Sequence, residues 1–282
     1  MKSLLEFKSP YSLKYQVPSQ FAGVSYLLLL LILLSGCGSF TVPFWKNKKT
    51  GLLSGDYQDM SSRDYADHLA SLKNPFLATP GVKTLRTDGV INKYFSDLAT
   101  ELISNNEIFF SDLKTASVII LDTDSPLHFS LPKGEIFISR GLLTKYIKHE
   151  SMLVGIVAYE LVRSEKLLYP KSTIIPVGFV PLERMLTFGR LPIDSKMEVH
   201  KWAHHITVRS GYDGEYYLSW LQIQNRNTAD FILQVGDANM IDREESMFKA
   251  FLIKNAIEDV STKKNSSKNF YTVINRIRDG VL

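Results

Sequence analysis

The sequence has very little cysteine: Cys37 is the only one among 282 residues. A single cysteine excludes an intramolecular disulfide and any zinc or iron–sulfur site built from cysteines. Net charge is also small, because 33 lysines and arginines against 29 acidic residues give a formal value of +4. An excess of that size does not indicate nucleic-acid binding, so no partner of that class is expected. With 45% hydrophobic and 22% charged residues, the composition is that of a globular protein, which excludes wholesale disorder and fibrous classes.

An apolar run, Tyr26–Leu34, ends shortly before the cysteine and is too short to cross a bilayer, which needs about 20 residues. Three lysines precede this run, and the small residues Ser35 and Gly36 follow it, an order typical of a secretory signal peptide. The four residues from Leu34 to Cys37 resemble a bacterial lipobox, in which the cysteine is lipidated and becomes the new amino terminus. We therefore expect residues 1–36 to be a lipoprotein signal peptide and Cys37 to carry a lipid anchor.

Gly38 follows the cysteine. In well-studied enteric bacteria an aspartate at this place favours retention in the inner membrane, so its absence resembles the outer-membrane class. The expected location is the bacterial cell envelope, with the protein lipid-anchored in the outer membrane and facing the periplasm. Residues 37–60 contain proline, glycine and lysine and few periodic apolar positions, which predicts a lipidated tether before a folded domain over 61–282.

The pattern in the folded domain is mainly helical, with short β-branched stretches. Apolar residues at helical spacing predict a helix over Val90–Leu102, and Glu150–Leu168 reads as a long buried helix that ends before Pro170. Short strands are predicted at Ser117–Leu121 and Glu135–Ser139. Four more helices are predicted, near 196–210, 214–225, 243–259 and 270–278.

Three segments between residues 127 and 214 resemble, in order and spacing, the motifs of one peptidase family. Leu127–Leu143 is similar to the strand motif Asn-Ala-Phe-x-x-Pro-Gly-Gly-x-Ile-x-Val-x-x-Gly-Leu. Tyr159–Arg163 stands where the family has His-Glu-x-x-His on a helix. Glu198–His200 and Ser210–Asp213 stand where it has Glu-Ala-Asp and then Ala-Gly-Tyr-Asp. Together they resemble the gluzincin metallopeptidase family forty-eight, which includes periplasmic lipoprotein proteases, over about a third of the chain. The resemblance implies an α+β, zincin-like fold, mainly helical, with a small mixed or antiparallel sheet beside the cleft.

The departures from the family motif bear on function. In the family two histidines one helical turn apart and a distant glutamate bind zinc, and the glutamate beside the first histidine activates water. Here Tyr159 and Arg163 replace the histidines, whereas Glu160, the general base, and Glu198, the third ligand, are retained. Neutral tyrosine is a poor zinc ligand, and arginine does not lose its proton. A guanidinium about 4 Å from a divalent cation would cost about 8 kcal/mol at an effective dielectric of about 20. We therefore expect no bound metal or cofactor. If a metal is bound, Glu198 is its expected ligand.

If the fold is kept, Arg163 and Glu198 are predicted to form an ion pair where zinc would sit, with Tyr159 and Glu160 as hydrogen-bonding neighbours. An acid/base pair of Glu160 and Glu198, as in glycosidases, is less favoured because the arginine lies between them. His200 and His204 have metal-ligand spacing but lie on the helix face opposite Glu198, which leaves a surface metal site or a packing role open.

The first hypothesis for function is a catalytically inactive lipoprotein that binds another envelope protein or a peptide segment, or serves as a scaffold. Its peptide-binding site is predicted on an edge strand made of Glu135, Ile136, Phe137, Ile138 and Ser139. The proline-rich segment 171–192 is expected to pack over the cleft. The alternative is a zinc metalloendopeptidase of the periplasm that uses non-standard metal ligands, with Glu160 as its catalytic residue.

Overall fold

The computed structural model describes residues 61–170, 178–255 and 262–280. The predicted signal peptide, Cys37 and the tether over 37–60 lie outside these ranges, as do residues 171–177 of the proline-rich segment. Within them the chain is mainly helical and holds one small mixed sheet, which confirms the predicted α+β class. No helix in the described ranges is both long and apolar enough to span a bilayer.

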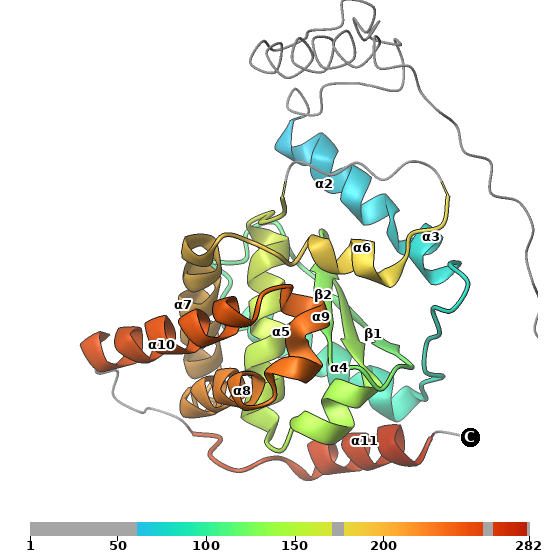
Figure 1. Ribbon diagram of the computed structural model, residues 1–282. Coiled ribbons are helices and arrows are strands. Elements are labelled where there is room, and N and C mark those ends of the chain that lie inside the picture. The colour runs from blue at the N-terminus through green and yellow to red at the C-terminus, as the bar shows by residue number, and fades with distance from the viewer. Residues whose placement is uncertain (1–60, 171–177, 256–261, 281–282) are drawn as a thin grey trace, which may run out of the picture. The chain divides into compact units, whose positions relative to one another are not determined.

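Three of the helices precede the sheet (Figure 1): α2 (Ser62–Ser71), α3 (Lys73–Leu77) and α4 (Gly89–Ser104). The last contains the helix predicted over Val90–Leu102. Its start is set by Asp88, whose carboxylate accepts hydrogen bonds from the amides of Val90 and Ile91 at 3.0 and 2.9 Å. These bonds satisfy two of the amides that lack partners in the first turn of a helix.

The sheet contains β1 (Ser117–Leu121), β2 (His128–Leu131) and β3 (Glu135–Ser139), in the order β1-β3-β2. The two strands predicted from the sequence are present with the predicted bounds. β3 runs parallel to β1 and antiparallel to β2. The turn between β2 and β3 needs a glycine at Gly134, where φ is 75° and an added Cβ would lie 2.6 Å from the carbonyl oxygen of Thr115.

The prediction that Glu135, Ile136, Phe137, Ile138 and Ser139 form a peptide-binding edge strand is wrong. These residues are β3, the central strand, and both of its edges are hydrogen-bonded to neighbours. The reason lies in its three consecutive apolar residues, which are typical of a strand that is buried on both faces. An edge strand would alternate between the core and the solvent.

The two faces of β3 contribute to two hydrophobic cores. Ile136 and Ile138 pack into the larger core, with α4, α5 and the carboxyl-terminal helices. Phe137 points into the smaller core, where its ring stacks on that of Phe129 with centroids 4.7 Å apart. Phe76 meets Phe137 edge-on at 5.5 Å, so α3 is held against this side of the sheet.

The middle of the molecule is α5 (Glu150–Glu165), the helix predicted over Glu150–Leu168, and all 16 of its residues are buried. It packs against β2 on one side and the helices α7 (Ile193–Arg209) and α8 (Glu215–Arg226) on the other (Figure 1). A helix that is apolar all round belongs in the interior, and here it carries Glu160 and Arg163 there with it.

The remaining elements surround α5 and the sheet. The predicted helices near 196–210, 214–225, 243–259 and 270–278 are present, within the described ranges, as α7, α8, α10 and α11. The helices α2, α3, α6 and α9 were not predicted with bounds from the sequence. The bounds of the elements not yet given are η2 (Leu142–Tyr146, a π-helical turn), α6 (Leu182–Thr187), α9 (Thr228–Val235), α10 (Ala238–Asn255) and α11 (Lys268–Asp279).

Gly155 sets how closely α5 and α8 approach. A Cβ added at Gly155 would lie 2.4 Å from Cδ2 of Tyr217, a buried ring on α8. We expect Gly155→Ala to lower the free energy of unfolding by about 1–3 kcal/mol, because overpacking outweighs the gain in helix propensity. Urea unfolding measures this. Gly89→Ala is the control, since no atom lies within 4 Å of its added Cβ; a Gly155→Ala variant as stable as Gly89→Ala would contradict the packing argument.

Candidate functional site

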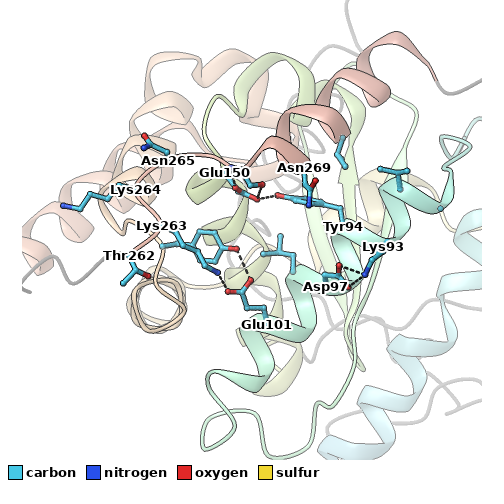
Figure 2. Close-up of a pocket in the computed structure, with 16 residues that line it drawn as sticks. Lys93, Tyr94, Asp97, Glu101, Glu150, Thr262, Lys263, Lys264, Asn265 and Asn269 are labelled. Atoms are coloured by element: carbon cyan, nitrogen blue, oxygen red, sulfur yellow. Dashed lines mark hydrogen bonds and ion pairs between the residues drawn. The ribbon is translucent and has the colours of Figure 1, made fainter.

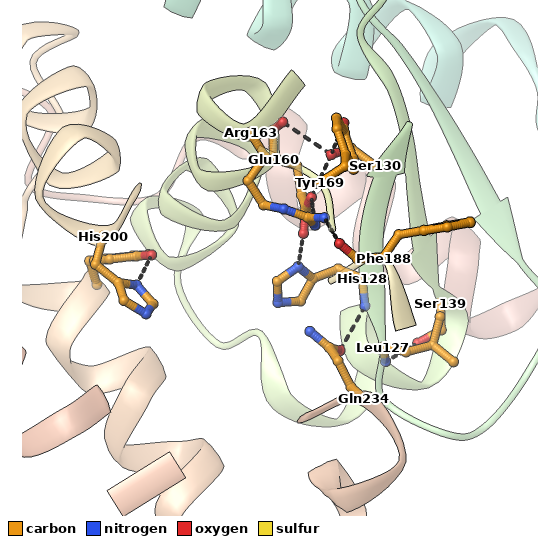
Figure 3. A network of polar contacts seen from close by, with 11 residues as sticks. Leu127, His128, Ser130, Ser139, Glu160, Arg163, Tyr169, Phe188, His200 and Gln234 are labelled. Carbon is orange, nitrogen blue, oxygen red and sulfur yellow. Dashed lines mark hydrogen bonds and ion pairs between the residues drawn. The ribbon is translucent and has the colours of Figure 1, made fainter. Parts of the chain in front are cut away.

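Glu160 lies at the centre of a buried polar network between α5 and β2 (Figure 3). Its Oε1 is 2.6 Å from Nδ1 of His128, at the start of β2. Its Oε2 accepts hydrogen bonds from Ser130 Oγ at 2.7 Å and from a guanidinium nitrogen of Arg163 at 2.8 Å. We call these four residues the Glu160 network. No role was predicted for His128 or Ser130, which are two residues apart on β2 and therefore lie on the same face of the sheet.

The electrostatics of the network favour a charged carboxylate. Burial raises the pKa of Glu160, but the charge of Arg163 and the contacts with His128 and Ser130 outweigh burial and bring the pKa down to about 2. Burial lowers the pKa of Arg163 and Glu160 raises it, with a net rise. Both partners are thus ionised at neutral pH, as an internal ion pair.

Arg163 is held by more than its carboxylate partner. A second guanidinium nitrogen donates to the carbonyl oxygen of Phe188 at 2.7 Å, and the guanidinium carbon lies 5.2 Å from the ring centroid of Tyr169. Its Nε has no hydrogen-bond partner among the described residues. The Phe188 contact ties the segment after α6 to α5.

The predicted ion pair between Arg163 and Glu198 is wrong, as is the possibility that Glu160 and Glu198 work together. The Glu198 side chain is 60% exposed and pairs with Lys201 at 2.6 Å. The inner face of α7 holds Lys196 and His200, each two residues from Glu198, and two residues correspond to 200° around a helix. Motif spacing predicted the helix but not which of its faces is buried.

A second buried network joins α7, α8 and α10. Lys196 Nζ contacts one carboxylate oxygen of Glu244, and His200 Nε2 lies 3.0 Å from the other. Nδ1 of His200 is 2.7 Å from the hydroxyl of Tyr217. Burial by itself would raise the pKa of Glu244, but the hydrogen bond from His200 and the charge of Lys196 outweigh burial, so the pKa is lowered. Sequence analysis missed Lys196 and Glu244. The helical spacing does indicate that Glu244 is buried. Counted from Ile241, Glu244 is at i+3 and Phe248 at i+7, so the three lie on the apolar face of α10.

Tyr159 lies between the two networks. Its ring centroid is 6.0 Å from that of His128 and 4.9 Å from that of His200. Burial raises its pKa far above the ordinary value for tyrosine, so the side chain is neutral. The space beside it, lined by residues of both networks, has a volume of about 30 Å³. That is room for one or two water molecules and not for a peptide.

The possible surface metal site at His200 and His204 is also wrong, because both side chains are buried and His200 uses both ring nitrogens in the contacts above. The packing role is confirmed. In the part of the chain that the structure describes, no group of three histidine, cysteine or acidic side chains is arranged to hold a metal ion.

The residues at the predicted zinc position do not fit zinc. Arg163 places a positive charge beside Glu160, Tyr159 is neutral and buried, and Glu198 points away from both. A cation there would meet the guanidinium repulsion of about 8 kcal/mol, and both oxygens of the nearby Glu160 carboxylate are already engaged by His128, Ser130 and Arg163.

A larger cavity, of about 1010 Å³, lies between α4, the start of α11 and residues 262–267 (Figure 2). Charged and polar side chains line it, and those that Figure 2 joins by dashed lines pair with one another. Glu150 accepts a hydrogen bond from the hydroxyl of Tyr94 at 2.8 Å, and Glu101 contacts both Lys263 and the hydroxyl of Tyr212. These contacts link α4, α5 and the segment before α11, which gives the polar groups a structural role.

No family model and no curated protein matches the sequence. The resemblance to a peptidase family therefore stays a prediction, and function has to be inferred from the geometry of the two networks.

Removing one member of the buried ion pair tests the Glu160 network. Arg163→Met leaves a buried carboxylate without its counter-charge, so we expect the free energy of unfolding to fall by about 3–5 kcal/mol. The double variant Glu160→Gln/Arg163→Met should recover about half of that loss, since neither charge remains. Glu198→Gln, at the exposed pair, should change stability by less than about 0.5 kcal/mol. Urea unfolding measures all three, and an Arg163→Met variant as stable as Glu198→Gln would rule out the network as described.

His204 gives the folded protein a pH dependence. Neither ring nitrogen has a hydrogen-bond partner in the described ranges. Burial lowers the pKa to about 4, the neighbouring His205 adds to this, and a weak contact with the Gly214 backbone only partly opposes it.

In the unfolded chain His204 binds a proton more readily, with a pKa near 6.5. The contribution of neutral His204 to the free energy of unfolding is therefore fully present above pH 6.5 and is lost as the pH falls toward 4. The loss due to His204 amounts to about 3 kcal/mol at most. His204→Leu should therefore lose less stability than the natural protein between pH 6.5 and pH 4, as measured by urea unfolding at each pH. Two curves that run parallel over this interval would show that His204 does not titrate as described.

Proposed function

We propose that this chain is a bacterial envelope lipoprotein with a zincin-like fold that does not hydrolyse peptides. It acts as a scaffold or protein-binding subunit, held at the outer membrane by lipid on Cys37. The observation that carries the proposal is the ion pair between Glu160 and Arg163 in the interior.

A glutamate that serves as a general base needs a pKa near the working pH and an oxygen directed at its water. Glu160 has neither. Its pKa is about 2, and both of its oxygens are engaged by residues of its own network. The position that resembles the catalytic glutamate of the family is thus used to hold α5 and β2 together.

The chain itself covers the place where a peptide would lie beside β2. The amide of His128 donates to the side chain of Gln234 at 2.9 Å, so this edge already has a partner on α9. Val180, Leu186 and Phe188 pack on the same side of the sheet, in the smaller core. This agrees with the packing role expected for the proline-rich segment, in its described part. A protein partner would therefore bind elsewhere on the surface.

The alternative, a zinc endopeptidase with non-standard ligands, is less well supported. It requires Glu198 to approach Glu160, whereas Glu198 is on the solvent side of α7 and pairs with Lys201. It also requires a cation next to Arg163, whose guanidinium is fixed by Glu160 and by the carbonyl of Phe188.

Elemental analysis and a peptidase assay separate the two functions. We expect full-length protein purified without chelators to contain far less than one zinc per chain. Cleavage of an unstructured protein such as casein should be indistinguishable between the natural chain and Glu160→Gln, because both Glu160 oxygens are engaged by His128, Ser130 and Arg163. Stoichiometric zinc that is lost in Glu198→Gln, or cleavage that Glu160→Gln abolishes, would overturn the proposal in favour of the peptidase.

A further inference from the structure

Several large apolar side chains remain exposed at one place on the surface. The ring of Phe109 lies against that of Trp202, with centroids 4.8 Å apart, and Lys166 Nζ is 4.4 Å from the centroid of Phe109. Trp202 is 46% exposed and Ile108 is 92% exposed. Ile108 precedes Phe109 in the chain, and Leu167, which is 37% exposed, follows Lys166; we call Phe109, Trp202 and these neighbours the Trp202 patch. It is built by three separate segments: the loop after α4, the end of α5, and the outer face of α7.

The patch is held in place by buried contacts. Next to its loop, the carboxylate of Glu165 accepts hydrogen bonds from the amides of Ser111 and Leu113, both at 2.9 Å. Phe110, which lies between Phe109 and Ser111 in the chain, is fully buried. Leu167 has a φ of 50°, the left-handed conformation that commonly ends a helix, and the amide of Leu168 donates to the carbonyl oxygen of Arg163 at 3.0 Å, as in a Schellman motif. Ile108 and Leu167 thus face the solvent because the backbone on either side is fixed.

The point at which the chain enters its described part adjoins this patch. Arg63 and Ala66, in the first turns of α2, line a cleft of about 710 Å³ together with Leu113, Glu165 and Leu167. The expected tether, from Cys37 to Met60, has about 24 residues and can reach at most about 80 Å from the lipid. A tether of this length allows the patch to reach the bilayer, and the described part of the chain begins beside the cleft that Leu167 lines.

We propose that the Trp202 patch contacts the headgroup region of the bilayer in which Cys37 is anchored; this inference rests on the lipid anchor of the proposed function. Tryptophan is the residue that favours the membrane interface, and the amphipathic Lys166 can direct its charge toward lipid phosphates. A patch of this size binds a bilayer weakly when free, but a covalent tether raises its effective concentration at the surface. The patch then fixes which face of the domain is turned to the membrane.

Fluorescence of Trp202 tests the contact in the full-length protein. The chain has three tryptophans, so Trp45→Phe and Trp220→Phe leave Trp202 as the only one. The protein is purified from membranes in detergent and reconstituted into phosphatidylethanolamine–phosphatidylglycerol vesicles, with or without lipid brominated on the acyl chains. We expect the brominated lipid to lower Trp202 emission about twofold or more, as for a side chain at the interface. The control probe is Tyr271→Trp, half-exposed on α11, in a background that also carries Trp202→Phe; it should not be quenched.

Mass spectrometry of the amino-terminal peptide in the same sample separates the two proposals. An unmodified Cys37 would overturn the lipid anchor and this inference with it. An acylated Cys37 together with an unquenched Trp202 would overturn only this inference. A Trp202 that is unquenched by lipid and also shielded from iodide would assign the patch to the tether, a second copy or a protein partner instead.

A pair of surface variants avoids replacing the buried Trp220. Ile108→Glu and Ile253→Glu each put a carboxylate at an exposed apolar site, and both sites are at least 74% exposed, so neither should affect folding. In a Trp45→Phe background that keeps the buried Trp220, Ile108→Glu should remove most of the quenching by brominated lipid, and Ile253→Glu should leave it unchanged. Equal quenching in the two variants would contradict the proposed orientation.

Discussion

The ion pair between Glu160 and Arg163 is the constraint on which the rest of the interior depends. An isolated charge in a protein core costs several kcal/mol, so a buried pair persists only where other groups satisfy the remaining donors and acceptors. Here those groups come from β2, through His128 and Ser130, and from the segment after α6, through the carbonyl of Phe188. The carboxylate and the guanidinium therefore determine where β2 and the segment after α6 lie against α5, and they fill the space beside β2.

The second network is a similar buried ion pair, formed between α7 and α10. Lys196 of α7 and Glu244 of α10 neutralise one another, and His200 links them to α8 through Tyr217. Tyr159 separates the two pairs, and because it is neutral, each pair is balanced on its own. We infer that these pairs specify how the helices are oriented more than they add stability, because replacement of a buried pair by well-packed apolar residues is often neutral. A large apolar helix such as α5 would otherwise accept several rotations against its neighbours.

Much of this fold could be predicted from the sequence, because it depends on local patterns. The β-branched stretches at Ser117–Leu121 and Glu135–Ser139 form strands, and the long apolar stretch from Glu150 forms a buried helix. What could not be predicted depends on contacts between distant segments. The place of β3 in the sheet depends on a parallel partner more than ten residues earlier. The burial of Lys196 instead of Glu198 depends on Glu244, which lies on another helix. Charged residues look solvent-exposed until their partner is known, and the motif resemblance, which placed Glu198 at the cleft, favoured the wrong face of α7.

The distribution of satisfied and unsatisfied groups indicates where this molecule interacts. Catalytic sites keep polar groups available at a cleft, with pKa values near the working pH. In Glu160 the opposite holds, since its pKa is far below neutrality and its oxygens are fully used by neighbours. Among the exposed large apolar side chains of the described residues, Trp202 and Ile108 stand beside backbone that is held by buried hydrogen bonds. The closed interior around Glu160 and the exposed Trp202 patch therefore both support the proposal that this domain holds a position on a membrane and does not process a substrate.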